Sequence, residues 1–271
     1  MSDDKAEPAA KRPSDLLLRT LVGIGLIAVA AFALFLGGIV FWLLCTVLGV
    51  LMMAEWADLD RAEPKQKRLA MYALFVPLAI MFPLAAGPGF FALGLVAAAF
   101  FFLAIVTRGA TLAAGAFYVG LPVLALLLIR HQQDGIVYAF WTLALVWMTD
   151  IGAYFAGRTI GGPKLAPALS PNKTWAGLIG GVVLASLFAA FMHREYGLAM
   201  RLTLATPVLA VAAQTGDLFE SWLKRRAGVK DSGNILPGHG GVLDRLDGLV
   251  PVAPLAAALL VVVPKLYVLL P

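Results

Sequence analysis

Long apolar segments alternate with short polar ones over nearly the whole chain. Runs of roughly 20 apolar residues, the length that crosses a bilayer as a helix, recur with few ionisable groups inside them. They predict about nine membrane-spanning helices, at residues 16–36, 39–56, 69–86, 90–106, 110–129, 136–156, 175–191, 202–222 and 249–270. We therefore expect an all-α, polytopic integral membrane protein.

Composition and charge agree with this pattern. Apolar residues make up 61% of the 271 residues and charged residues 14%, whereas a soluble domain carries roughly 25% charged residues. The single cysteine, Cys45, lies inside an apolar run, so we expect neither a disulfide framework nor a thiolate metal cluster. The net charge of +5 comes from Lys and Arg beside apolar runs, so membrane topology explains it better than nucleic-acid binding.

The basic residues also predict an orientation. If the N-terminus is cytoplasmic, all 21 Lys and Arg lie on the inner side except Arg130, Arg194, Arg201 and Lys265. Because Lys and Arg accumulate in cytoplasmic loops, we expect the C-terminus outside and place the protein in a bacterial inner (plasma) membrane. Three regions follow: a disordered tail at 1–14, N-terminal spans at 15–135, and a region at 136–271 in which carboxylates, Lys, Arg and Gly gather.

One predicted helix carries a row of polar residues. They are Gln214, Asp217, Glu220, Ser221 and Lys224. At 100° per residue they fall within an arc of roughly 120°, and a carboxylate in a spanning helix is costly unless it faces water, a cation or the bundle interior. A helix end that reaches water would explain Lys224 but not Asp217, about two turns farther in. The row therefore predicts a polar cavity.

A second polar row lies at the end of the predicted span 136–156. Its members share one face of the helix: Asp150, Tyr154, Gly157 and Arg158. It could meet the first row across the same cavity. Alternatively, Asp150 and Arg158 form a neutralising pair inside the membrane.

The segment 161–175 contains prolines and glycines that exclude a regular helix. Ser170 or Thr174 could cap the helix that follows, and Lys164 and Lys173 beside that helix N-terminus would complement a phosphate. A tight cytoplasmic turn with topology-setting lysines is the alternative.

The densest polar segment is 230–248. Residues that allow anionic oxygens to approach closely stand together in it: Gly238, His239, Gly240 and Gly241. Asp244 and Asp247, three positions apart, present two carboxylates on one face, as needed to hold Mg²⁺ together with substrate phosphates. We interpret the convergence of carboxylates, basic groups and glycines as metal-assisted phosphoryl or nucleotidyl chemistry.

The same residues resemble a known signature. The matching positions are Ser221-Trp222-Leu223-Lys224-Arg225, Lys230-Asp231, Leu236-Pro237-Gly238-His239-Gly240-Gly241 and Asp244-Arg245-Leu246-Asp247. They are similar to the phosphatidate cytidylyltransferases, also called CDP-diacylglycerol synthases. The resemblance extends upstream to about Asp150. It implies transfer of cytidylyl from CTP to phosphatidic acid, which gives CDP-diacylglycerol and pyrophosphate for phospholipid synthesis, with Mg²⁺ and also K⁺ as candidate cations.

The resemblance also implies roles for individual residues. Asp217 and Asp244, joined by Asp247, would be the metal carboxylates. The residues expected to act in catalysis are Asp217, Asp244, Lys224, Arg245 and His239. Those expected to bind substrate are Asp150, Lys164, Ser170, Lys173, Ser221, Arg225, Lys230, Asp231, Gly240 and Gly241. The expected partners are CTP, phosphatidic acid and membrane lipids, with a homodimer left open and no nucleic acid.

Two alternatives stay open at this point. Ionisable residues in spans also mark ion-coupled transporters, although a transporter would place polar groups near the midplane of several helices, and here they crowd toward one face. Another membrane-embedded, CTP-dependent lipid transferase would use the same chemistry.

Overall fold

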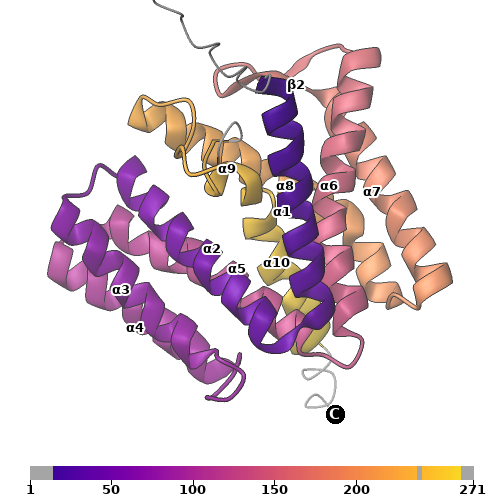
Figure 1. Cartoon of the computed structure of the whole chain (residues 1–271). Coiled ribbons are helices and arrows are strands. Elements are labelled where there is room, and N and C mark those ends of the chain that lie inside the picture. The colour runs from indigo at the N-terminus through magenta and orange to yellow at the C-terminus, as the bar shows by residue number, and fades with distance from the viewer. Residues whose placement is uncertain (1–14, 237–239, 264–271) are drawn as a thin grey trace, which may run out of the picture.

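Helices make up most of the molecule (Figure 1). The computed structural model describes residues 15–236 and 240–263. The α-helices are α1 (Asp15–Leu36), α2 (Gly38–Leu59), α3 (Pro64–Ile80), α4 (Phe90–Thr107), α5 (Ala110–Arg130), α6 (Gly135–Thr159), α7 (Trp175–Tyr196), α8 (Met200–Ala227), α9 (Leu243–Leu246) and α10 (Leu249–Ala257). A π-helical turn at Ala258–Val262 continues α10.

Six of these helices are long and apolar enough to cross a membrane: α2, α4, α5, α6, α7 and α8. Two shorter apolar helices cover Thr20–Leu36 and Leu249–Val262. The prediction of a polytopic, mainly helical membrane protein is confirmed at this level, whereas the total of nine spans and the orientation stay predictions. The predicted tail at 1–14 and the end of the predicted span at 249–270 lie outside the described residues.

The predicted boundaries of the third span were wrong. Helix α3 begins at Pro64, before the apolar run, because Pro fits the first turn of a helix and Glu63 and Gln66 form a capping box there. The helix ends at Ile80, and turns occupy the residues that follow it. A run of apolar residues predicts only the apolar part of a helix, so the polar first turn of α3 was missed.

The helices pack in two groups joined by α10. Helices α2 to α5 contact one another, and α6 to α8 form a second group (Figure 1). Helix α10 contacts α5 of the first group and both α6 and α8 of the second. The segment that ends in α9 and α10 is therefore held between the two halves of the chain.

Small residues let α6 and α7 approach closely. A Cβ atom on Gly152 would lie 2.5 Å from the Gly180 carbonyl oxygen, and one on Gly181 would lie 2.6 Å from the Thr149 carbonyl oxygen. Such small-residue contacts are a common way for membrane helices to associate. The close contact fixes the position of the segment that connects the two helices.

That connection is a β-hairpin, which the sequence did not predict. Strands β1 (Lys164–Ala166) and β2 (Ser170–Thr174) are antiparallel, with Lys164 opposite Thr174 and Ala166 opposite Ser170. The exclusion of helix by proline and glycine was correct. Thr174 also caps α7 as expected, because its Oγ1 accepts a hydrogen bond of 3.0 Å from the Gly177 N–H.

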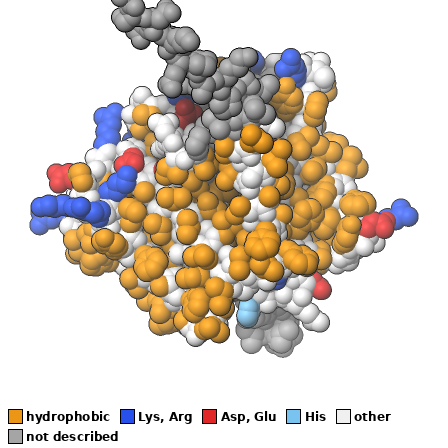
Figure 2. Space-filling view, in the orientation of Figure 1, with side chains coloured by type: hydrophobic (Ala, Val, Ile, Leu, Met, Phe, Trp, Pro, Cys, Tyr) orange, Lys and Arg blue, Asp and Glu red, His pale blue; other side chains and the backbone are white. Residues whose placement is uncertain are grey.

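The outer surface fits a lipid environment. Figure 2 shows hydrophobic side chains over most of one face, with Lys, Arg, Asp and Glu gathered toward its edges. Large apolar side chains such as Phe35, Ile105 and Leu204 are more than half exposed, which would be unfavourable against water and is ordinary against lipid.

Candidate active site

The polar row on α8 faces the protein interior. The Gln214 and Glu220 side chains are buried, with exposed fractions of 4% and 1%, and Asp217 is partly buried between them. Their spacing along the helix places them on one face. Helix α8 therefore directs its polar residues inward, as the sequence indicated.

A polar cavity of about 210 Å³ lies between α6, α8 and β2. Its walls include Asp150 and Tyr154 of α6, Lys173 of β2, and Gln214 and Asp217 of α8. Lys173 Nζ lies 2.5 Å from Asp217 Oδ2, and Gln214 Nε2 donates to Asp150 Oδ1 over 3.3 Å. The two polar rows thus meet across one cavity.

The alternative pair of Asp150 with Arg158 is not the arrangement observed. The exposed Arg158 donates from Nη1 to the Tyr154 hydroxyl over 3.0 Å and lies over the Tyr154 ring. Asp150 instead contacts Gln214.

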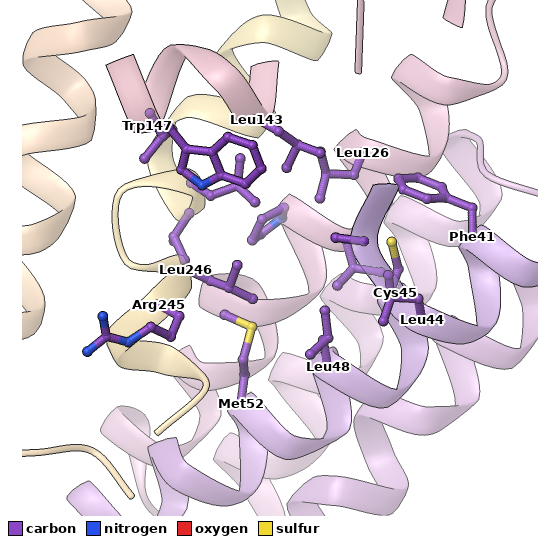
Figure 3. Close-up of a pocket in the computed structure, with 16 residues that line it drawn as sticks. Phe41, Leu44, Cys45, Leu48, Met52, Leu126, Leu143, Trp147, Arg245 and Leu246 are labelled. Atoms are coloured by element: carbon purple, nitrogen blue, oxygen red, sulfur yellow. The ribbon is translucent and has the colours of Figure 1, made fainter. Parts of the chain in front are cut away.

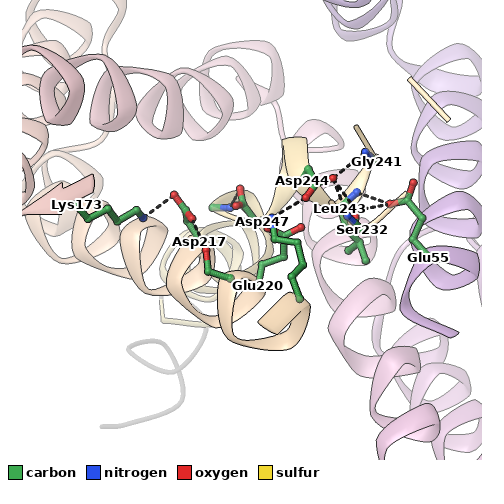
Figure 4. Close-up of polar contacts among 12 residues, drawn as sticks. Glu55, Lys173, Asp217, Glu220, Ser232, Gly241, Leu243, Asp244 and Asp247 are labelled. Carbon is green, nitrogen blue, oxygen red and sulfur yellow. Dashed lines mark hydrogen bonds and ion pairs between the residues drawn. The ribbon is translucent and has the colours of Figure 1, made fainter. Parts of the chain in front are cut away.

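Lys224 forms ion pairs with two buried acids, Glu220 and Asp244, both of which are labelled in Figure 4. Its Nζ lies 2.7 Å from Glu220 Oε2 and 2.7 Å from Asp244 Oδ1. The two carboxylate side chains are 1% and 4% exposed, and that of Lys224 is 16% exposed. One ammonium group therefore neutralises the charge of two buried carboxylates. In this structure Lys224 binds Asp244 and holds it in place.

The other carboxylate oxygen of Asp244, Oδ2, is also surrounded by hydrogen-bond donors. Asp244 Oδ2 accepts hydrogen bonds from the Ser232 N–H (2.9 Å) and the Gly241 N–H (2.8 Å), with the Ser232 hydroxyl 3.0 Å away. Burial alone would raise the pKa of Asp244, but the hydrogen bonds from Lys224, Gly241 and Ser232 outweigh it and hold this pKa below its usual range. Gly240 has a φ of +79°, and a Cβ there would lie 2.8 Å from Asp244 Oδ2. Both the backbone conformation and the lack of space therefore require glycine at this position.

Asp247 lies at the end of α9 and faces α8. Close packing brings it there, because a Cβ on Gly216 of α8 would clash with the Asp247 carbonyl oxygen and with Pro251. The Gly248 N–H donates to Asp247 Oδ1 over 2.7 Å. Burial, and then the nearby charges of Asp217 and Asp150, raise the pKa of Asp247 to about 7.

This set of carboxylates fits a divalent cation in part. Asp217 and Asp150 line one cavity with Lys173, and their charges help to raise the pKa of Asp247. Within the described residues, however, no three His, Cys, Asp or Glu side chains are close enough to form a complete cation site. The donors present therefore suit a hard cation that takes its remaining oxygen ligands from substrate or water, and both oxygens of Asp244 are already engaged.

The remaining predicted residues fall into two groups. Ser221 Oγ donates to Asp217 Oδ1 over 3.4 Å, so it belongs to the cavity. The others stand at the surface or farther along the hairpin: Lys164, Arg225, Lys230 and Asp231 are exposed and Ser170 is half-buried. His239 lies outside the described residues.

An apolar pocket of about 130 Å³ lies on the other side of α9 (Figure 3). Apolar side chains of α2, α5, α6 and α10 form most of it, among them Cys45, Leu48 and Trp147. Arg245 lies at its edge, and the guanidinium points away from Cys45 and Leu48.

Two residues of the site were not predicted. Glu55 of α2 is 1% exposed and contacts the segment that carries Asp244, and Ser232 contacts both acidic side chains. Glu55 lies near the end of a predicted span. The rule that singled out Asp217, that an ionisable group in a span needs a partner, applies to Glu55 equally and could have found it. Nothing in the spacing of Ser232 distinguishes it.

Comparisons with known proteins give a consistent result. The family model described as "Cytidylyltransferase family" matches residues 17–263. A phosphatidate cytidylyltransferase of Brucella suis biovar 1 (strain 1330) is 40% identical over 251 residues, which cover 89% of this chain and 92% of that protein. One of Rickettsia bellii (strain RML369-C) is 30% identical over 254 residues, covering 90% of both. One of Bacillus subtilis (strain 168) is 46% identical over 143 residues, covering 51% of this chain and 53% of that protein.

Proposed function

The chain belongs to the cytidylyltransferase family and transfers cytidylyl from CTP to phosphatidic acid to form CDP-diacylglycerol, and we propose that this transfer takes place in the cavity at Asp217. The observation that carries this placement is the meeting of Asp150, Asp217 and Lys173 from three separate elements in one polar cavity. In an otherwise apolar helical bundle, such a concentration of charge is costly unless it serves a polar ligand.

The chemistry requires positioning more than a reactive side chain. An oxygen of the phosphatidate phosphate attacks the α-phosphorus of CTP, a new P–O bond forms, and the bond to the β-phosphate oxygen breaks to release pyrophosphate. The nucleophile is already an anion, so no serine or cysteine nucleophile is needed. The protein must bring two anions together and neutralise the charge on the leaving group.

The cavity and the edge of the apolar pocket provide cations for this task. Among the described residues Lys173 forms an ion pair with one carboxylate, Asp217, and can exchange it for a phosphate oxygen. Arg245, at the edge of the apolar pocket, can bind phosphate through two N–H groups. A direct contact of Lys224 or His239 with substrate stays a prediction, as do substrate contacts by Lys164, Ser170, Arg225, Lys230 and Asp231.

We assign a magnesium ion to the carboxylate side of the cavity. Asp217 would hold it together with Asp247 once Asp217 releases Lys173, and Asp244 would join them only after releasing Lys224 or its N–H donors. Mg²⁺ in such a place neutralises charge on the substrate phosphates. A K⁺ ion beside it, expected from the family resemblance, is a further proposal.

The lipid substrate would approach from the apolar side. The pocket of Figure 3 supplies apolar surface for part of an acyl chain, and Arg245 lies at the edge of this pocket. A phosphatidate with its phosphate at Arg245 would therefore keep its apolar part away from the charged groups.

We place the site at the cytoplasmic face of a bacterial inner membrane, where CTP is found. In support, Arg61 after α2 donates to the Ala227 carbonyl oxygen at the end of α8, so two predicted inner loops lie at one end of the bundle. The basic residues favour the same side. Residues 15–135 would then act as the N-terminal unit and 136–271 as the catalytic one, and a homodimer stays a prediction.

The direct test uses purified protein in detergent micelles with radiolabelled CTP, phosphatidic acid and Mg²⁺. We expect labelled CDP-diacylglycerol in the organic phase and pyrophosphate in the aqueous phase. The matched pair of variants is Lys173→Gln in the cavity and Lys65→Gln on the exposed surface. Loss of product in the first variant with normal product in the second supports the placement. Equal activity in both would show that the reaction takes place elsewhere.

A further inference from the structure

A buried carboxylate from the N-terminal half contacts the segment that carries Asp244. Glu55 of α2 is 1% exposed, and its oxygens lie within hydrogen-bond distance of three donors (Figure 4). The Val242 N–H donates to Oε1 over 2.9 Å and the Leu243 N–H donates to Oε2 over 2.8 Å. The Ser232 hydroxyl lies 3.1 Å from Oε2.

The Ser232 hydroxyl connects Glu55 to Asp244. It lies 3.1 Å from Glu55 Oε2 and 3.0 Å from Asp244 Oδ2. A hydroxyl has one proton, so it donates to one of these carboxylates at a time. The backbone donors then divide between the two acids: Val242 and Leu243 serve Glu55, whereas Ser232 and Gly241 serve Asp244.

The chain packs closely on Glu55 at two glycines, Gly233 and Gly241. A Cβ on Gly233 would lie 2.7 Å from Glu55 Oε1, and a Cβ on Gly241 would lie 2.7 Å from Glu55 Oε2. Neither glycine has a positive φ, so backbone conformation does not require glycine at either position. The space taken by the Glu55 carboxylate accounts for Gly233, and this carboxylate together with the still closer Ser232 hydroxyl accounts for Gly241.

The same end of α2 also holds the end of α8. Arg61 Nη2 donates to the Ala227 carbonyl oxygen over 3.0 Å. Helix α2 therefore contacts both sides of the cluster in which Lys224 of α8 binds Asp244 of α9. Glu55 and Arg61 are thus two points at which the N-terminal half contacts the elements that carry Asp244 and Lys224.

We propose that Glu55 is a positioning residue for cytidylyl transfer: its carboxylate fixes Ser232, Val242 and Leu243 and thereby orients Asp244 and Asp247 toward α8. The inference rests on the proposed function of the cavity. It assigns to the N-terminal half a part in catalysis that extends beyond anchoring. Because a misplacement of about 1 Å can cost on the order of 100-fold in rate, a loose segment would lower turnover without removing any group that touches substrate.

The test compares Glu55→Gln with Glu195→Gln. The first change keeps the size of the side chain but replaces one acceptor oxygen by an amide donor, which faces N–H groups that are themselves donors. Glu195 is half exposed and pairs only with the exposed Arg194 in the described part of the chain, so its variant controls for the chemical change. Both are purified in detergent and compared with wild type for kcat, for KM of CTP and of phosphatidate, and for amide hydrogen exchange at Val242 and Leu243.

We expect kcat per folded molecule to fall about 10- to 100-fold in Glu55→Gln, with both KM values within roughly threefold of wild type. Exchange at Val242 and Leu243 should accelerate, and Glu195→Gln should match wild type in every measurement. Unchanged kcat per folded molecule in Glu55→Gln, beside an active wild type, overturns the inference even if the variant is less stable. Absence of product with the wild type would instead refute the proposed function.

A second variant keeps the inference testable if Glu55→Gln fails to fold. Gly233→Ala leaves the carboxylate in place but pushes the segment away from it. We expect the same fall in kcat and the same faster exchange at Val242 and Leu243. If a folded Gly233→Ala protein turns over at the wild-type rate, Glu55 does not position the segment for catalysis.

Discussion

Substitution of Lys224 by methionine should destabilise the protein strongly, and a second substitution should restore part of the loss. Lys224 Nζ lies 2.7 Å from both Glu220 and Asp244, whose side chains are 1% and 4% exposed. Methionine keeps most of the volume but removes the charge. Asp244 would retain its N–H donors from Ser232 and Gly241, whereas Glu220 would lose the cation with which it is paired.

The magnitude follows from the burial of these groups. Removal of one partner from a buried ion pair costs about 3–5 kcal/mol, because an uncompensated charge stays in a poorly solvated place. For a chain of this size, each kcal/mol lowers the unfolding temperature by about 2–4 °C. We therefore expect the midpoint of thermal unfolding to fall by roughly 6–20 °C in Lys224→Met.

The assay is thermal unfolding in one detergent at one protein concentration, for wild type, Lys224→Met, Glu220→Gln and the double variant. Since a neutral Glu220→Gln side chain no longer needs the ammonium group, the double variant should be more stable than Lys224→Met. A coupling energy between the two sites of about 1–3 kcal/mol is expected. Additive losses, or a Lys224→Met protein as stable as wild type, would refute the idea that this lysine neutralises both acids.

Three further predictions concern packing, the lipid pocket and the metal. Gly216→Ala should lower stability by about 1–3 kcal/mol and reduce activity, because its Cβ would meet the Asp247 carbonyl oxygen; Gly94→Ala, where a Cβ has open space, should be neutral or slightly stabilising in the same thermal and activity assays. Leu48→Phe should raise KM for phosphatidate by roughly 3- to 10-fold, the range for one small steric change in an apolar site, and leave KM for CTP unchanged; equal effects on both substrates would contradict the placement of the acyl chain. Treatment with EDTA should abolish turnover and added Mg²⁺ should restore it, and activity that survives chelation would refute the metal assignment.

Local periodicity was enough to predict part of the site. Asp217 and Lys224 share one face of α8 because residues three and four positions apart do so in any helix. The cost of charge in a membrane then indicates that this face is buried. The same reasoning applied to α6 gave a meeting with Asp150 as one of two alternatives, and the structure shows this one.

Contacts between distant segments could not be predicted in this way. Glu55 lies far from Leu243 in the sequence, and no spacing rule connects them, so its three donors became apparent only in the structure. The hairpin at 164–174 was missed because its strands are only a few residues long and lack alternating apolar positions. The boundary of α3 was missed because its first turn is polar.

The most direct test of the central claim, that cytidylyl transfer takes place at the Asp217 cavity, is the turnover of Asp217→Asn. The control is Asp58→Asn. Asp58 forms an exposed ion pair with Lys67, whereas Asp217 pairs with Lys173 inside the cavity. At saturating CTP, phosphatidate and Mg²⁺, we predict that Asp217→Asn loses at least about 100-fold in kcat with a thermal midpoint close to wild type. Wild-type turnover in a folded Asp217→Asn protein would contradict the account.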